Sequence, residues 1–335
     1  MLKDKLKNMS KHLFTYHLGI ICLSLVVFSC TPVASDPAPE AAIPSGPYVI
    51  VLGIAQDAGY PQTACRKECC TQVWEGQEQP QKVSCLGLVD PVTQQLWLLD
   101  ATPDFREQWQ LLSKELPNTT ITQPSGVFLT HAHLGHYTGL LQLGREVMGA
   151  QAVPVYAMPR LDTFLRSNGP WSQLVNLGNI ALQPLKSDST LVLNGQLKVT
   201  PVQVPHRDEY SETVGFRVEG PGKSLLFIPD IDKWDRWHRS LSEEIAAVDI
   251  AFLDATFFAD GELPNRDMSK IPHPFVSETM DLLGGLPSTE RQKVHFIHLN
   301  HTNPLLQTKS PARQEVAERG FQVAFEGQRV ELSEK

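Results

Sequence analysis

The sequence predicts an α/β domain in which two β-sheets pack face to face and helices cover their outer sides. The main observation is the order of the predicted elements: strands come first, then alternating strands and helices, and this order occurs twice. Turn signals at Asn194-Gly195 and at 220–222 predict two antiparallel hairpins. The composition agrees, since 41% of the 335 residues are hydrophobic and 20% are charged, as in ordinary globular proteins. No internal repeat or second domain is evident.

The first 30 residues have the features of a lipoprotein signal peptide. Four lysines precede an apolar run at 18–28, which ends at Ser29-Cys30. The run is shorter than the roughly 20 residues that span a bilayer comfortably. Residues 27–30 resemble a bacterial lipobox, in which the cysteine carries the lipid. We therefore expect Cys30 to anchor the protein to a membrane of the cell envelope, on its periplasmic or surface face.

Residues 31–47 predict a flexible tether between this anchor and a domain at 48–335, because they contain five prolines and several small residues. The formal net charge is −8, and residues 1–30 hold four lysines and one aspartate, so the residues after them carry −11. An acidic body without a basic run argues against nucleic acid as a partner and leaves a small-molecule substrate as the expected one.

Within the domain, each predicted strand is a short apolar or β-branched run bounded by turn residues. The predicted strands are 48–52, 85–89, 95–99, 127–130, 153–156, 191–193, 197–204, 213–218, 224–228, 248–253 and 294–299. A helix is predicted after Thr102, which can act as its N-cap, with Pro103 at the first helical position. Further helices are predicted at 140–148 and 159–166.

Residues 127–139, VFLTHAHLGHYTG, are the most informative part of the chain. A buried strand leads directly into a turn that contains His131, His133 and His136. Neutral imidazole is the commonest transition-metal ligand in proteins, and ligands on a tight turn can converge on one point. The stretch therefore predicts a metal site at the end of this strand.

His131-Ala-His133-Leu-Gly135-His136 resembles the H-x-H-x-D-H signature of the metallo-β-lactamase-fold hydrolases, with Gly135 in place of the aspartate. Four other stretches resemble the branch of that family containing coenzyme PQQ synthesis protein B and related phosphodiesterases. They are VLGIAQDAGYPQTAC (51–65), LLDATPDFREQW (98–109), DIAFLDATFF (249–258) and FIHLNHTNPL (296–305). The resemblance implies the αββα sandwich of that family over the whole domain.

The resemblance also implies a first metal site. His206, after VQVP, matches the third histidine ligand, and Asp230, after LLFIP, matches the bridging carboxylate. The three imidazoles of His131, His133 and His206 would hold Zn²⁺ and leave one position for a water molecule, whose pKa the metal lowers towards 7, with Asp230 shared with a second site. Iron and manganese are alternatives, since imidazole and carboxylate suit several divalent ions.

A second metal would bind His136, His298 and Asp230 by the same resemblance. His301 is an alternative: it could replace His298 as the ligand, or it could support the ligand His298 without touching the metal. Because Gly135 removes one carboxylate, we expect one tightly bound zinc ion and a weaker second ion. On that reasoning, Gly135→Asp should tighten the second ion, unless glycine is needed there for a positive φ.

Four cysteines follow Cys30, and they are Cys65, Cys69, Cys70 and Cys85. Members of the resembled family often carry such a cluster here, and it could bind a structural zinc ion. Disulfides are the competing interpretation, because the cell envelope is oxidising. The spacing does not distinguish the two.

Asp254 and His273 match a carboxylate and histidine pair of the related phosphodiesterases. In that pair the histidine donates a proton to the leaving group and the carboxylate orients it, which suits a histidine with a pKa near neutrality. With the metal-bridging Asp230, they are the predicted catalytic residues. Asp208 and Glu209 could orient the neighbouring His206.

Three functions agree with these features. The first is an exported metal-dependent hydrolase that cleaves a phosphodiester or related ester. The second is a role like that of PQQ synthesis protein B in quinone cofactor biosynthesis, with metal-dependent oxidation. The third is a non-catalytic protein that binds a small molecule in the same pocket. Bound zinc or manganese would favour the first, bound iron with oxygen consumption the second, and binding without turnover the third.

Overall fold

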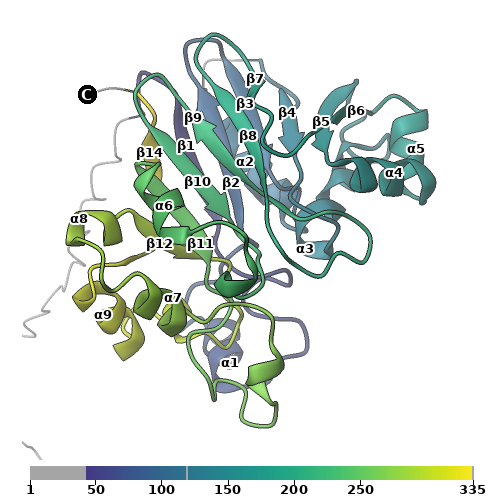
Figure 1. Ribbon diagram of the computed structural model, residues 1–335. Helices are drawn as coiled ribbons and strands as arrows, with labels where there is room; N and C mark the ends of the chain where they lie inside the picture. Colours follow the sequence, from purple (N-terminus) through teal and green to yellow (C-terminus); the bar gives the residue numbers. More distant parts are fainter. Residues whose placement is uncertain (1–42, 118–119, 334–335) are drawn as a thin grey trace, which may run out of the picture. The chain divides into compact units, whose positions relative to one another are not determined.

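A computed structural model describes residues 43–117 and 120–333, and Figure 1 shows how their elements are arranged. The predicted signal peptide, Cys30 and most of the predicted tether lie outside these ranges and stay predictions. In the ranges that are described, no helix combines the length and the apolar character that a membrane span requires. The first strand begins at Tyr48, where the sequence predicts it.

Within the described residues, the first sheet has seven strands in the order β14-β1-β2-β3-β4-β5-β6. They are β1 (Tyr48–Gly53), β2 (Cys85–Asp90), β3 (Gln95–Leu99), β4 (Gly126–Phe128), β5 (Val153–Ala157), β6 (Ile180–Pro184) and β14 (Arg329–Glu331). Pairing is antiparallel from β14 to β3 and parallel from β3 to β6. β1 and β2 are buried along their whole length, because both faces of the sheet are covered.

The second sheet, again within the described residues, has the order β13-β12-β11-β10-β9-β8-β7. Its strands are β7 (Leu191–Val192), β8 (Lys198–Gln203), β9 (Val214–Glu219), β10 (Ser224–Ile228), β11 (Ile250–Asp254), β12 (Val294–Ile297) and β13 (Gln322–Val323). Pairing is antiparallel from β7 to β10 and parallel from β10 to β13. The two predicted hairpins are confirmed as β7–β8 and β9–β10.

The helices of the described residues lie on the outer sides of the two sheets or in the loops between strands (Figure 1). They are α1 (Glu68–Trp74), α2 (Phe105–Ser113), α3 (Leu134–Tyr137), α4 (Pro159–Ser167), α5 (Trp171–Asn176), α6 (Leu241–Ala246), α7 (Val276–Leu282), α8 (Ser288–Arg291) and α9 (Pro311–Glu318). The predicted sandwich of two sheets between helices is therefore confirmed.

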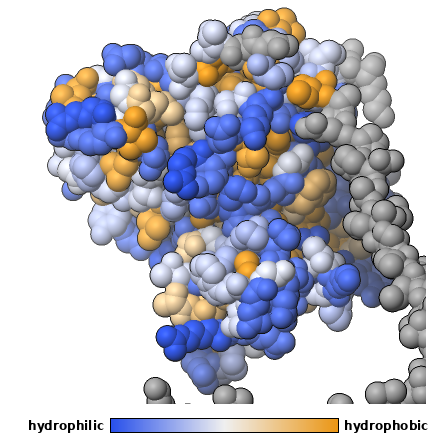
Figure 2. Space-filling view, turned by 180° about the vertical axis from the view of Figure 1, so that it is seen from behind, coloured by the Kyte–Doolittle hydropathy of each residue, from blue (hydrophilic) through white to orange (hydrophobic). Residues whose placement is uncertain are grey.

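Alternate residues of one strand enter different cores. Val49 and Val51 of β1 face the core between the two sheets, whereas Ile50 faces the core beneath α2, α4 and α5. In the core between the sheets, the rings of Phe128 and Phe216 meet edge to face at 5.6 Å. Fully burying each such side chain contributes about 1.5–3 kcal/mol. The surface in Figure 2 is mostly hydrophilic, with hydrophobic residues scattered in small groups.

Two helix predictions needed correction. The predicted helix at 140–148 is absent, and the chain instead forms α3 and a 3₁₀ helix at Thr138–Leu143. A Cβ at Gly139 would lie 2.2 Å from the carbonyl oxygen of Thr102, so the chain there is pressed against the segment after β3. α2 begins at Phe105, two residues later than predicted, and the Thr102 hydroxyl accepts a hydrogen bond from the N–H of Asp104.

The strand ends place the functional site. β10, β11 and β12 run parallel, so their carboxyl ends meet at one edge of the second sheet. Asp230 follows β10, Asp254 ends β11 and His298 follows β12. His206 follows β8, and the histidine turn follows β4 of the first sheet. Side chains from both sheets therefore converge at this edge.

Candidate metal centre

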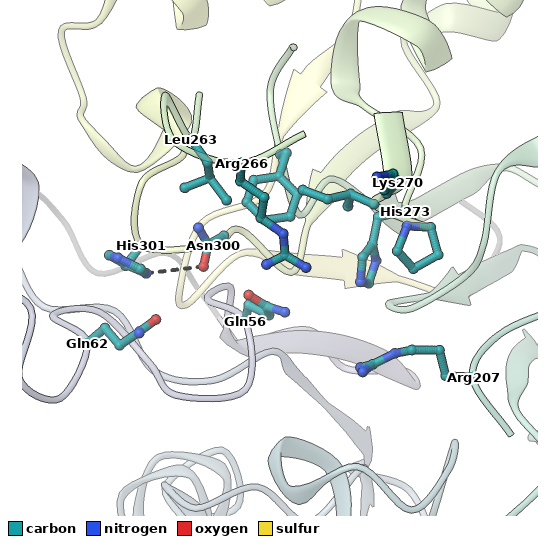
Figure 3. Close-up of a pocket in the computed structure, with 12 residues that line it drawn as sticks. Gln56, Gln62, Arg207, Leu263, Arg266, Lys270, His273, Asn300 and His301 are labelled. Atoms are coloured by element: carbon teal, nitrogen blue, oxygen red, sulfur yellow. Dashed lines mark hydrogen bonds between the residues drawn. The ribbon is translucent and has the colours of Figure 1, made fainter. Parts of the chain in front are cut away.

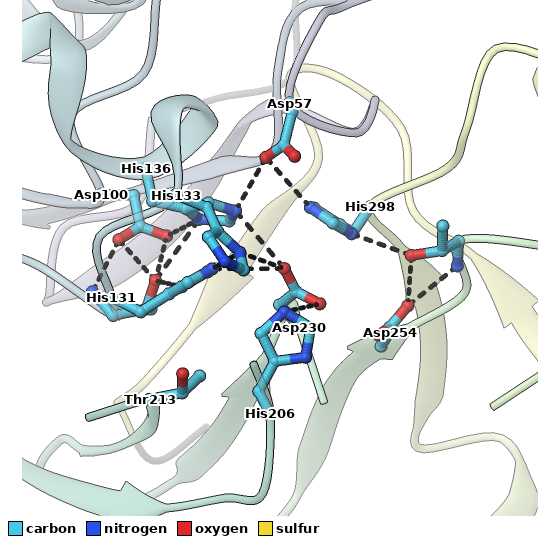
Figure 4. A network of polar contacts seen from close by, with 12 residues as sticks. Asp57, Asp100, His131, His133, His136, His206, Thr213, Asp230, Asp254 and His298 are labelled. Atoms are coloured by element: carbon cyan, nitrogen blue, oxygen red, sulfur yellow. Dashed lines mark hydrogen bonds and ion pairs between the residues drawn. The ribbon is translucent and has the colours of Figure 1, made fainter. Parts of the chain in front are cut away.

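The first predicted set of ligands is brought together by the fold (Figure 4). His131, His133, His206 and Asp230 each direct one donor atom to a common point, and these atoms lie within 4.8 Å of one another. The two oxygens of Asp230 lie 3.3 Å from Nε2 of His131 and 3.3 Å from Nε2 of His206. All of these side chains except that of His133 are buried, so the donor atoms are largely shielded from solvent.

These separations are close to those between the ligands of a bound zinc ion. Zinc binds nitrogen and oxygen at about 2.0–2.2 Å, so two of its ligands lie about 3.3–3.5 Å apart. His131 presents Nε2 and His133 presents Nδ1, 2.8 Å apart, so this pair would have to separate slightly around an ion. The residues present therefore fit a metal ion.

The other predicted ligands, His136 and His298, form a second group together with Asp57. Oδ1 of Asp57 lies 3.3 Å from Nε2 of His136 and 4.0 Å from Nε2 of His298 (Figure 4). Asp230 adjoins this group, since its Oδ2 lies 3.9 Å from Nε2 of His136. The sequence reasoning missed Asp57. Its only signal was the stretch 51–65, which was noted for its resemblance and not for this side chain.

Buried polar atoms without a hydrogen-bond partner accumulate at this point of the molecule. Such atoms are rare in folded proteins, and each one calls for an explanation such as a bound ion. Five of them lie here: Asp57 Oδ1, His136 Nε2, His206 Nε2, Asp230 Oδ1 and His298 Nε2. Metal ions bound by these two groups of donors would give all five atoms a partner.

Each buried histidine of the two groups is also held from its other nitrogen. The contacts are His131 Nδ1 to Thr130 Oγ1 at 3.0 Å, His136 Nδ1 to Asp100 Oδ2 at 2.8 Å, His206 Nδ1 to Asp232 Oδ1 at 3.2 Å, and His298 Nδ1 to Thr256 Oγ1 at 3.1 Å. Such partners fix the ring orientation and the tautomer of metal-binding histidines. The prediction that Asp208 and Glu209 orient His206 is corrected, because Glu209 contacts His133 and Asp208 accepts a bond from Thr213.

The ionisation of the metal-free centre follows from its burial and charges. Burial raises the pKa of the Asp230 carboxyl, but the charges of His206 and His273 outweigh it and hold that pKa well below its ordinary value. Burial lowers the pKa of His206, but Asp230 outweighs it and raises that pKa to about 10. The carboxylate is thus anionic at neutral pH, and a metal that binds here displaces a proton.

The predicted pair of His273 and Asp254 is in contact. Nδ1 of His273 lies 2.8 Å from Oδ2 of Asp254 and 3.2 Å from Oδ1 of Asp230. Asp254 is fully buried, and its carboxylate also accepts bonds from the N–H of Ile231 and from Thr256. The Nδ1 side of the His273 ring is therefore occupied by carboxylates, which leaves Nε2 for other partners.

A cavity of about 470 Å³ lies beside the metal centre and shares His273 with it (Figure 3). Arg207, Arg266 and Lys270 line it together with Gln56 and Asn300. Arg207 and Arg266 form no ion pair within the part of the chain that the structure describes. The cavity is thus lined by one histidine and three cationic side chains, and such a lining suits an anionic ligand.

The cysteine cluster differs from the prediction in one residue. Cys65, Cys69, Cys70 and His301 place their donor atoms within 4.8 Å of one another, and the described cysteines form no disulfide. Cys85 is not part of the cluster, because it faces the core beneath α2 and its thiol points to the carbonyl of Asp100. Since His301 belongs here, it does not replace His298 in the metal centre.

The fold and the donor groups define a protein of the metallo-β-lactamase fold. The chain belongs to the beta-lactamase superfamily, whose domain matches residues 97–299. It is similar to coenzyme PQQ synthesis protein B of Pseudomonas syringae pv. tomato, with 29% identity over 85% of this chain and 100% of that protein. The same protein of Methylorubrum extorquens is 28% identical over the same shares.

Solved structures agree. The zinc-bound PqqB of Methylobacterium extorquens superposes with a TM-score of 0.72 and 26% identity, covering 85% of this chain and 100% of that one. A diphosphatase of the PhnP family superposes with a TM-score of 0.58 and 20% identity, covering 85% and 96%, and this likeness concerns the fold alone. The resemblance drawn from the sequence is confirmed at the level of fold and family.

Proposed function

We propose that the protein is a metal-dependent hydrolase that cleaves a phosphodiester or a related phosphate ester. The observation that carries the proposal is the cavity beside the metal centre, since three cationic side chains and His273 surround it. An anionic ester bound there would lie next to the donor groups of the metal. Held by the imidazoles of His131, His133 and His206, with the Asp230 carboxylate beside them, a zinc ion would supply a hydroxide at neutral pH and polarise the ester.

The chain's own side chains would bind and orient the substrate. Arg207 and Arg266 reach into the cavity from different sides, so they can bind two phosphate oxygens (Figure 3). His273 donates from Nδ1 to Asp254 and can give a proton from Nε2 to the leaving oxygen. Asp254 holds the ring in that orientation, because its carboxylate is fixed by backbone and hydroxyl donors.

The test is hydrolysis of chromogenic esters by the purified protein loaded with zinc, manganese or iron. We expect bis(p-nitrophenyl) phosphate to be hydrolysed faster than p-nitrophenyl acetate, and a chelator to abolish the reaction. Arg266→Ala should raise KM more than it lowers kcat. Arg145→Ala should change neither, because Arg145 is exposed and its ion pair among the described residues is with its neighbour Glu146. Failure to hydrolyse any phosphate ester with any of these metals would refute the proposal.

A second candidate function is a role like that of PQQ synthesis protein B. Its support is the similarity over the whole length of those relatives. Such a role would use a redox metal, and the test is bound iron together with oxygen consumption. The predicted export counts against it, because a lipid-anchored protein is far from a cytoplasmic biosynthetic step. Ligand binding without any turnover would instead favour a carrier or sensor.

The cysteine cluster would hold a structural zinc ion. Its support is the donor set of Cys65, Cys69, Cys70 and His301, since three thiolates and one imidazole complete a tetrahedral zinc site. Cys69 Sγ and Cys70 Sγ lie 3.9 Å apart, close to the separation of two sulfur ligands at about 2.3 Å from one zinc ion. The proposed location remains the cell envelope, with Cys30 as the lipid-bearing residue.

A further inference from the structure

We propose that Asp57 supplies to the second metal the carboxylate that the histidine motif lacks at Gly135. The inference rests on the proposed function in that both use the same metal centre, but it concerns binding of the ion and not the reaction. In the motif a carboxylate is expected one residue before His136. Here the carboxylate comes from a loop 78 residues before Gly135 in the chain.

The position of Asp57 is that of a ligand. Its Oδ1 is buried and without a hydrogen bond, and it faces Nε2 of His136 at 3.3 Å. The same oxygen lies 4.0 Å from Nε2 of His298, which is also buried and without a partner. The three atoms converge on one point, and an ion bound there would satisfy all of them.

The space at Gly135 is complementary to Asp57. A Cβ at Gly135 would lie 2.2 Å from Oδ1 and 2.5 Å from Cα of Asp57, closer than real Cβ atoms come. Gly135 lies in α3, and its φ is not positive. Close approach of the Asp57 loop, and not backbone conformation, therefore requires glycine here. A side chain at position 135 and the carboxylate of Asp57 exclude each other, as expected if one replaces the other.

The loop that carries Asp57 is fixed to the segment that carries His298. The N–H of Gln56 donates to the carbonyl of Leu299, and the N–H of Leu299 donates to the carbonyl of Ile54, both at 2.8 Å. Asp57 follows directly, in a turn closed by the bond from Gly59 N–H to Gln56 O. The backbone thus holds Asp57 next to His298 whether or not a metal is present, so the ligand is preorganised.

The second ion would then have two carboxylates, Asp57 and Asp230, and two imidazoles, His136 and His298. This is the donor set that an aspartate at position 135 would provide. The expectation of a single tight ion loses its basis, because the missing negative charge is restored from another part of the chain. We expect two ions to bind at the histidine centre.

The test counts metal without reference to activity. Metal-free protein is reloaded with zinc, and the bound ions are measured by elemental analysis and by competition with a chelator. Cobalt substitution reports thiolate-bound ions separately through their absorption, so ions at the cysteine cluster can be subtracted. Wild type should hold two ions at the histidine centre. Asp57→Asn should weaken the second by more than the ~10–100-fold that follows loss of a ligand's hydrogen-bonding neighbour.

Asp249→Asn is the matched control, because its carboxylate accepts bonds from Ser224 and takes no part in the donor groups. It should bind zinc as wild type does. Asp57→Ser serves as a second variant, and thermal melts of the metal-free proteins show whether each is folded. Unchanged affinity for both ions in the Asp57 variants would overturn the inference, and so would wild-type protein with a single ion at the histidine centre in excess zinc. Loss of the second ion without any phosphate ester hydrolysis by wild type would leave the inference standing and refute only the proposed function.

Discussion

The histidine centre and the cysteine cluster are two groups of metal donors in one domain, and they differ in ways that indicate different roles. The histidine centre takes side chains from loops after strands of both sheets, and His273 beside it lines a cavity that His301 of the cysteine cluster also lines. The cysteine cluster takes three thiols from residues 65–70 and one imidazole, His301, which completes four donors. Catalytic zinc sites keep a position open for water or substrate, whereas structural sites are closed by protein ligands.

The two groups also differ in what holds them in place without metal. Hydrogen bonds to Asp100, Asp232 and Thr256 orient the histidines of the centre. In the cysteine cluster, the contacts of the Cys70 thiol are weak ones, among them a backbone N–H at 3.4 Å and the Cys69 thiol at 3.9 Å. We therefore expect the histidine centre to keep its shape when metal is removed and the cysteine cluster to depend on its ion.

The largest effect is expected for His206→Ala. It removes one of the three imidazoles proposed to hold the first ion and leaves Oδ1 of Asp230 without that neighbour. Loss of the ion removes several kcal/mol of transition-state stabilisation, so kcat should fall by at least about 10³-fold. Elemental analysis should show less metal at the histidine centre and an unchanged ion at the cysteine cluster. If the bound metal and kcat both stay at wild-type values, His206 is not a ligand.

Cys69→Ser should act on stability and not on chemistry. It removes a thiolate from the proposed structural zinc, and loss of a structural metal is among the changes that destabilise proteins most. We expect the free energy of unfolding to fall by about 3 kcal/mol or more, measured in urea, while kcat of the folded fraction stays within about twofold. Cys85→Ser is the comparison, because Cys85 is buried outside the cluster and should leave its metal content unchanged. Equal zinc content in Cys69→Ser and wild type would remove the basis for a structural ion.

His273→Gln should lower the rate without releasing metal. The glutamine cannot donate a proton to the leaving group, and general acid catalysis contributes about 10²–10⁴-fold. We expect kcat to fall by about 10²-fold for esters with poor leaving groups and little for p-nitrophenyl esters, which need no proton. The dependence of the rate on the leaving-group pKa is the measurement. A uniform fall for both kinds of ester would instead indicate a positioning role.

Gly135→Ala should destabilise the protein through the loops that form the histidine centre. The added methyl group meets the backbone of Asp57 at 2.5 Å, and overpacking of this kind costs about 1–3 kcal/mol. Gly135→Asp should cost at least as much and should not tighten the second ion, contrary to the expectation from the motif. Gly285→Ala is the control, because nothing lies within 4 Å of its added Cβ and its φ is not positive. Thermal melts of the metal-free Gly135→Ala and Gly285→Ala variants are the measurement. Equal melting temperatures of these two variants would show that the Asp57 loop can move away.

The smallest effect on the domain is expected for Cys30→Ala. This change should abolish lipid attachment and leave uncleaved or mislocalised precursor, because the cysteine is the predicted lipid-bearing residue. Neither metal group should change its zinc content, since Cys30 lies outside the domain. Fractionation and palmitate labelling are the measurements. Labelling of the variant at the wild-type level would refute lipidation at Cys30.

The strands and most ligands could be predicted from the sequence for a local reason. Each of His131, His206 and Asp230 comes directly after a short apolar run, and a run of that kind is itself the signal for a buried strand. A ligand that follows a strand is placed at the sheet edge by the strand. The predicted pair of Asp254 and His273 was likewise brought together, with Asp254 at the end of β11.

Other features of the two donor groups depend on contacts between distant segments, which give no local signal in the sequence. Cys85 was assigned to the cysteine cluster by residue type, but its place in β2 turns its thiol into the core beneath α2, and His301 takes the fourth position. Asp57 gave no local signal, because its place beside His136 arises from backbone bonds between the loop after β1 and the chain after β12. The local sequence therefore places the side chains that end the strands. The packing of loops across the sheet edge decides which other donors join the candidate metal groups, since that choice depends on how closely Gly135 lets the two loops approach.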